Sequence, residues 1–197
     1  FGITNTLKGG RVFAKAEASK ENPHILKGPI LIKDLKAIEA PVIARILNGM
    51  SLEGLGKILN NKEKGLLFKE ITTNITIDQS GRIDAKPDVI KLRDGKTKSE
   101  SLGLTFEGNI QPKTDQINLQ GTVVPIDDIN TFFASIPLIG DIITMGSRDA
   151  IFAATYSVKG KASNPDVSVN PLATLAPGFL RNLFFESDID ESRFEDE

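Results

Sequence analysis

Residues 121–185 read GTVVPIDDINTFFASIPLIGDIITMGSRDAIFAATYSVKGKASNPDVSVNPLATLAPGFLRNLFF, and this stretch decides the fold. It predicts a strand, an apolar helix interrupted at Ile136-Pro137, a long second strand, a turn at Asn164-Pro165-Asp166, a short strand over 167–169 and an amphipathic end. The strands alternate apolar and polar residues, which is typical of a sheet with one apolar face. The helical pieces carry apolar stripes suited to lie on such a face.

Strands with the same alternation precede this stretch. The segment 11–18 predicts one strand, and 30–35 predicts another that is entered through Gly28-Pro29, as a strand start or edge tolerates proline. From Leu66 the alternation returns over 71–77, and after a turn it continues over 82–92. Asp94-Gly95 is a hairpin signal, so the basic residues around it are expected at a solvated hairpin tip.

The clearest alternation lies in residues 101–110, and it recurs in residues 117–123 after a QPKTDQ turn. The two segments predict an antiparallel hairpin with one apolar face, and residues 152–158 predict a later strand of the same kind. The residues expected to line the apolar surface are Leu102, Leu104, Phe106, Ile110, Ile117, Leu119, Val123, Phe152 and Tyr156.

Short helices are predicted between the strands. Pro41 suits the first helical turn, and a second helix over 51–59 can be capped by Ser51. A third helical segment covers 127–143. A fourth covers 172–184, with Asn170 as its cap and Pro171 at its first helical position. The predicted fold class is therefore mainly β (α+β), with seven to nine antiparallel strands and three or four short amphipathic helices.

Composition and charge exclude several classes of function. The chain has 197 residues, no cysteine and a net charge of −2, so it has no disulfide or thiolate metal site. Seven acids and one arginine lie in residues 186–197, which leaves the rest only mildly basic and argues against nucleic acid as a partner. We expect residues 1–185 to form one domain of a longer protein, because the chain opens on Phe1, and residues 186–197 to form an acidic, disordered tail.

Residues with catalytic or metal-binding chemistry form no recognisable constellation. The single histidine, His24, lies beside a proline with no partner motif, and Asp127 and Asp128 are better explained as helix caps than as an acid–base pair. The basic residues Lys91, Arg93, Lys96 and Lys98 suit a solvated surface, and contact with anionic headgroups is the alternative. We therefore expect no enzyme activity, no cofactor and no metal.

Several motifs resemble those of one known family. They are GTVVP at 121–125 followed by Asn130, IPLIG at 136–140, YSV at 156–158 followed by Gly160, VNP at 169–171 and LAPG at 175–178. In this order and spacing they resemble the C-terminal region of the AsmA-like family, in its YhdP- and TamB-related branch. The resemblance covers residues from about Ile30 to Phe185, and it departs from the family pattern between Met145 and Ala150.

This resemblance implies a module of a Gram-negative envelope protein that is anchored in the inner membrane upstream of this chain and lies in the periplasm. Its relatives have curved sheets that form a long apolar groove for phospholipid acyl chains. We therefore expect a curved antiparallel sheet that binds phospholipid on its apolar face and serves lipid transport between the two membranes and outer-membrane biogenesis.

A structural function is the alternative. In that case the helical segments pack fully on the sheet, close the groove and contact a partner protein or a membrane. A large exposed apolar patch would favour lipid binding, and its absence would favour a cap.

Overall fold

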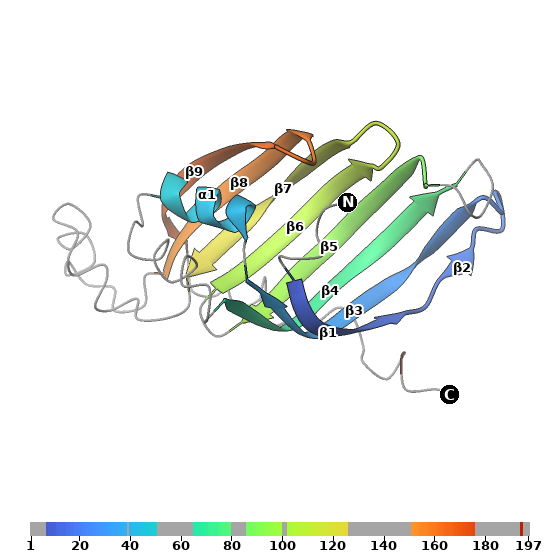
Figure 1. Ribbon diagram of the computed structural model, residues 1–197, viewed down its shortest axis with the longest axis horizontal. Helices are drawn as coiled ribbons and strands as arrows, with labels where there is room; N and C mark the ends of the chain where they lie inside the picture. Colours follow the sequence, from blue (N-terminus) through green and yellow to red (C-terminus); the bar gives the residue numbers. More distant parts are fainter. Residues whose placement is uncertain are drawn as a thin grey trace, which may run out of the picture.

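The computed structural model contains one nine-stranded antiparallel sheet, shown in Figure 1. It describes residues 7–38, 40–50, 65–79, 86–99, 102–125, 151–175 and 194. The strands follow the order β1-β3-β4-β5-β6-β7-β8-β9, and the short β2 pairs with β3 as well. Apart from β2, the sheet is thus a meander in which strands that follow one another in sequence are neighbours in space.

The fold class predicted from the sequence is confirmed, because strands dominate and the described residues contain one short helix. The nine strands also fall within the predicted number. The elements are β1 Leu7–Ala14, β2 Glu17–Ala18, β3 Ile25–Ala37, α1 Pro41–Gly49, β4 Leu66–Asp78, β5 Val89–Ser99, β6 Leu102–Gln111, β7 Gln116–Pro125, β8 Ile151–Lys161 and β9 Asp166–Leu175.

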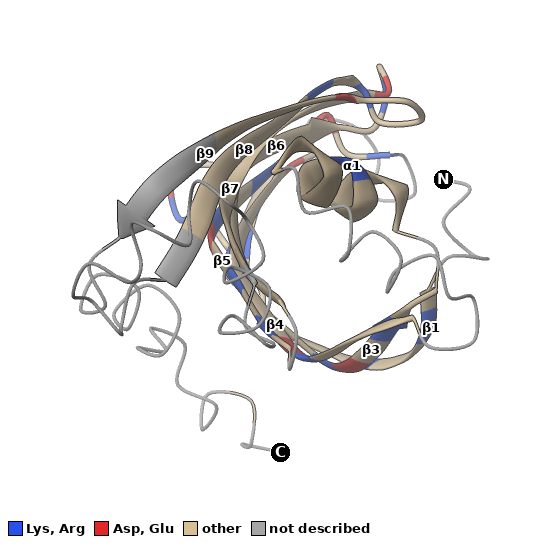
Figure 2. Cartoon of the chain, turned by 90° about the vertical axis from the view of Figure 1, so that its left-hand side faces the viewer, with Lys and Arg blue, Asp and Glu red and all other residues tan. Residues whose placement is uncertain are grey.

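The sheet is strongly curved, and Figure 2 shows α1 lying inside the curve. The face that carries α1 is called the concave face below, and the opposite face the convex face. Because side chains alternate along each strand, the register assigns them to faces: Leu104 on β6 lies opposite Val123 on β7, which lies opposite Ala154 on β8. These three residues belong to the same buried cluster as α1, so they lie on the concave face.

Helix α1 begins at Pro41, as the sequence predicts, because a proline at the first helical position loses no hydrogen bond. Its apolar residues recur at helical spacing, and Ile46 and Leu47 are both only 2% exposed. The helix ends at Gly49, and the backbone N–H of Met50 donates to the carbonyl groups of Ile46 and Leu47. Its position on the sheet therefore depends on this apolar stripe.

The single strand predicted over 11–18 is wrong in one respect, because the structure divides it into β1 and β2. The break at Lys15-Ala16 faces Gly28-Pro29, which lie inside β3 and not at its start. Pro29 has no N–H to donate to a neighbouring strand. Gly28 allows the other strand to approach closely, since a Cβ at this position would lie 1.8 Å from the carbonyl oxygen of Lys15.

The predicted hairpin at Asp94-Gly95 is also wrong. Both residues lie inside β5, which continues through them, and the pairing with β4 and β6 shifts register at this point. Asp94 has a φ of 53°, in the left-handed region, and the dipeptide forms a β-bulge. The basic residues at 91, 93, 96 and 98 consequently lie along one strand and not at a hairpin tip.

The bulge at Asp94 is open to a direct test. Asp94→Val should lower the free energy of unfolding by about 1–2 kcal/mol, because a β-branched side chain opposes the left-handed conformation. Asp94→Gly should be tolerated, since glycine adopts this conformation freely. Urea denaturation of both variants measures the difference. Lys91→Val, on the same strand, is the matched control and should be close to neutral; equal stability of all the variants would contradict the bulge.

The C-terminal strand is longer than the sequence predicts. Asn170 and Pro171 belong to β9 and do not begin a helix, so the helical prediction for Leu172 and Leu175 is wrong. β9 is an edge strand, and an edge strand accepts a proline where its missing N–H would face away from the sheet. The predicted helices over 51–59 and 127–143, the end of the fourth over 176–184 and the acidic tail over 186–197 lie outside the described residues.

Candidate functional site

Helix α1 packs on part of the concave face. Ile46 and Leu47 near the end of this helix, and Met50 directly after it, are at most 3% exposed and pack in one cluster with residues of the sheet. In Figure 1 the helix lies beside β8 and β9, and β9 is the strand it contacts most. The sheet residues of this cluster are Ala37, Leu66, Phe68, Leu102, Leu104, Val123, Ala154, Tyr156 and Val158.

Nine residues are predicted to bind lipid, and the structure describes the side chains of eight of them. All eight occupy concave positions in the register, but they differ in how far they are buried. Leu102, Leu104, Val123 and Tyr156 are buried in the cluster that contains α1. The half-buried residues are Phe106, Ile110, Ile117 and Leu119, of which the last two pack against the cluster. The ninth residue, Phe152, belongs to β8, and its side chain is outside the described part of the structure.

A second apolar group on the concave face was missed as a candidate site. It lies on β3, β4 and β5, where Ile32 faces Ile71 and Ile77 faces Ile90 across neighbouring strands. These residues are half-buried, and only Ile71 among them packs against the cluster around α1. The alternation of apolar and polar residues over 71–77 could have identified this group, since it assigns the apolar side chains to one face. The group is called the β3–β5 apolar row, and its half-buried members are Ile30, Ile32, Ile71, Ile77, Ile90 and Leu92. Ile75, which pairs with Leu92 on the same face, is buried.

Near the middle of the sheet, side-chain hydroxyls replace part of the backbone pairing between β6 and β7. The paired positions run to Leu104–Val123 and resume at Glu107–Gln120. Between them, the N–H of Thr122 donates to Thr105 Oγ1 at 2.9 Å. The Tyr156 hydroxyl donates to the carbonyl oxygen of Thr105 at 2.8 Å. These backbone groups thus remain satisfied where the regular pairing is interrupted.

Both parts of the Tyr156 side chain have partners, since its ring belongs to the apolar cluster and its hydroxyl is hydrogen-bonded. Burial raises the pKa of the Tyr156 hydroxyl well above its usual value, because the ionised form would be desolvated. The hydroxyl therefore stays protonated near neutral pH. It acts as a structural donor and is not poised for acid–base chemistry.

The convex face has a different chemistry. A hollow of about 830 Å³ crosses β5–β9 on this side. Its lining is dominated by hydroxyl and amide side chains, with Lys96 as its cation and Asp94 and Glu107 as its acids. The Gln120 amide donates to Glu107 at 2.7 Å. The convex polar positions of this lining are Thr105, Gln120, Thr122, Thr155, Ser157, Ser168 and Asn170. These side chains favour water over hydrocarbon, although Phe106 and Tyr156 also line the hollow.

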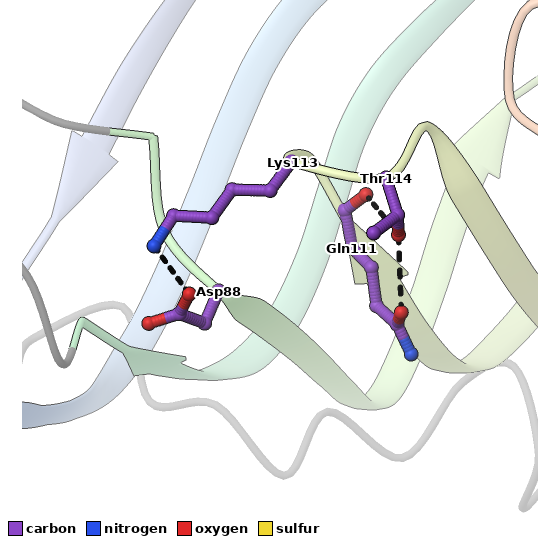
Figure 3. A network of polar contacts seen from close by, with 4 residues as sticks. All are labelled: Asp88, Gln111, Lys113 and Thr114. Carbon is purple, nitrogen blue, oxygen red and sulfur yellow. Dashed lines mark hydrogen bonds and ion pairs between the residues drawn. The ribbon is translucent and has the colours of Figure 1, made fainter.

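Surface contacts connect the turn between β6 and β7 to the start of β5 (Figure 3). In the turn between β6 and β7, Lys113 pairs with Asp88, which immediately precedes β5. Thr114 Oγ1 contacts the Gln111 side chain at 3.2 Å in the same turn. Both partners of the ion pair are partly exposed, so the pair contributes little stability, but it holds the turn beside the start of β5.

No metal-binding arrangement is found in the part of the chain that the structure describes. Its His, Asp and Glu side chains form no group of three that could hold a metal ion. In the same residues, no helix has the length and apolar character that crossing a bilayer requires. Comparison with known proteins finds no matching family model, curated protein or solved structure.

Proposed function

We propose that this chain is a non-enzymatic module that binds phospholipid acyl chains on its concave face. One observation carries the proposal: the β3–β5 apolar row stays half-buried on a curved sheet, and of its members only Ile71 packs against the cluster around the single described helix. Apolar side chains on a concave surface suit a flexible hydrocarbon chain, which needs contact and exclusion of water and no particular polar partner.

We further propose that the module belongs to an AsmA-like envelope protein, on the strength of the motif resemblance over residues from about 30 to 185. In this setting it would lie in the periplasm, as part of a protein anchored in the inner membrane. Its ligand would be phospholipid on the way between the two membranes, and an envelope protein would be a possible partner.

Fatty-acid binding tests this function directly. The fluorescent fatty acid cis-parinaric acid should bind the chain, and Ile77→Glu should weaken its binding about tenfold, equal to about 1.4 kcal/mol. A glutamate carboxylate at this position would lose its hydration when the acyl chain binds, or it would repel the carboxylate of the fatty acid. Either effect opposes binding. Thr76→Glu is the matched control, because Thr76 is the preceding residue of β4 and faces the convex side. Its binding should equal that of the parent.

Two results would contradict the proposal. One is a loss of binding that is equal in Ile77→Glu and Thr76→Glu, with circular dichroism showing that both variants are folded. The other is a parent protein that binds no fatty acid. The second result would favour the structural cap, which the burial of Leu102, Leu104 and Val123 in the cluster around α1 supports on its own arm of the sheet.

A further inference from the structure

Helix α1 occupies apolar surface of the kind that an acyl chain would use. The buried residues Ile46, Leu47 and Met50 share one cluster with concave residues of β6–β8 and of the ends of β3 and β4, and Val167 and Val169 of β9 pack against it. Four of the residues predicted to bind lipid lie in this cluster. If α1 moved away, the apolar surface of β6–β9 would join the β3–β5 apolar row in one continuous concave face.

The helix is attached mainly at the edge of the sheet. Gly49 lies against Val169 of β9, and α1 contacts this edge strand most. Arg45 supplies the polar attachment: its Nη1 donates to the carbonyl of Pro165 at 2.8 Å, and its Nη2 donates to Asn164 Oδ1 at 3.2 Å. Pro165 and Asn164 belong to the turn between β8 and β9. Moving α1 would therefore break no pairing between strands.

Taken alone, α1 is a weak helix. It has nine residues, its N-cap residue Ala40 makes no side-chain capping bond, its first turn holds no acid and its last turn holds no base. Isolated helices of this length are not stable in water, so α1 depends on its packing against the sheet. Hydrocarbon that occupied the same surface would remove that support.

We propose that α1 is a displaceable cover, held by Arg45, and that acyl chains compete with it for the concave face of β6–β9. The inference rests on the proposed lipid-binding function and adds its regulation. A ligand shifts such an equilibrium only if it prefers one state. Here the acyl chain gains the surface of β6–β9 only when α1 is displaced, so binding and uncovering are coupled.

A disulfide between α1 and β9 tests the proposal. The chain contains no cysteine, so Gly49→Cys with Val169→Cys gives one possible bridge. A Cβ at position 49 would lie 2.9 Å from the Cβ of Val169, and a disulfide needs about 3.8 Å, so a small shift suffices. The oxidised protein should bind cis-parinaric acid about tenfold more weakly than the reduced protein, because the disulfide prevents the displacement of α1 that binding requires.

Arg45→Ala tests the same proposal in the opposite direction, since loss of the attachment should strengthen binding. Arg11→Ala is its matched control, because it removes another arginine contact, with Asp34, far from α1 in the strand order. Val169→Cys alone controls for oxidation. Equal binding by the oxidised and reduced bridge protein would overturn the inference and leave the proposed function standing. A parent protein that binds no fatty acid would overturn the proposed function and the inference together.

Discussion

Gly121→Val is expected to destabilise the protein by about 3 kcal/mol or more, because it places a side chain where two strands already touch. Gly121 lies on β7 between Phe106 of β6 and Tyr156 of β8 in the register. A Cβ at this position would lie 1.9 Å from the carbonyl oxygen of Thr105 and 3.0 Å from the Tyr156 hydroxyl. Backbone cannot yield as the end of a side chain can, so β6 and β7 would have to separate.

Thermal unfolding followed by circular dichroism measures this effect. Gln120→Val is the matched control: it adds the same side chain at the preceding residue of β7, where Gln120 is exposed and loses only its bond to Glu107. The control should melt close to the parent, since valine favours strands. A Gly121→Val protein that also melts close to the parent would show that β6 and β7 are farther apart at this point than in the structure.

The alternation of residues was enough to predict the hairpin of β6 and β7. Over residues 104–110 and 117–123 apolar residues or glycine alternate with polar residues, so a shift of the pairing by one residue would move every apolar side chain to the other face. The start of α1 was equally readable, because Pro41 precedes an apolar stripe at helical spacing. Both features depend on residues that are close together in the sequence.

Features that depend on a neighbouring strand were not predictable in this way. Asp94-Gly95 serves a hairpin turn or a β-bulge equally well, and the bulge is chosen by the pairing of β5 with strands on both sides. Pro171 suits a helix start or an edge strand, and β9 is an edge only because the meander ends there. In both cases the residues suit either structure, and the neighbouring strands of the sheet decide which of the two forms.

The candidate site shows the same limit. Alternation identifies the apolar face, and Leu104 and Ile77 both carry that signal. It does not show which part of the face another element covers: Leu104 is buried in the cluster around α1, whereas Ile77 stays half-buried. The lipid-binding residues predicted from the sequence therefore include four that lie in the cluster around the helix, and they omit the β3–β5 apolar row.

Tyr156 should remain un-ionised well above about pH 10, the range in which an exposed tyrosine ionises. Its raised pKa has burial as its cause. The sign of the linked stability follows: the folded chain holds the proton more tightly than the unfolded chain, so the stabilisation is complete below the unfolded pKa. It is lost as the pH rises through the folded pKa, and the protein should unfold in alkali.

The chain offers a direct measurement, because Tyr156 is its one tyrosine and it has no tryptophan. The near-ultraviolet absorbance of the phenolate should stay absent until circular dichroism reports unfolding, and the two signals should then change together. In denaturant the same residue should ionise at about pH 10.

Tyr156→Phe should be less stable at neutral pH by about 1–3 kcal/mol, because the Thr105 carbonyl loses its donor. It should also lose less stability than the parent between neutral and alkaline pH, since it has no phenol to ionise. Phenolate absorbance that appears at the ordinary pH while the protein is still folded would show that the hydroxyl is open to solvent, and the hydrogen bond from Tyr156 to β6 would not be a buried one.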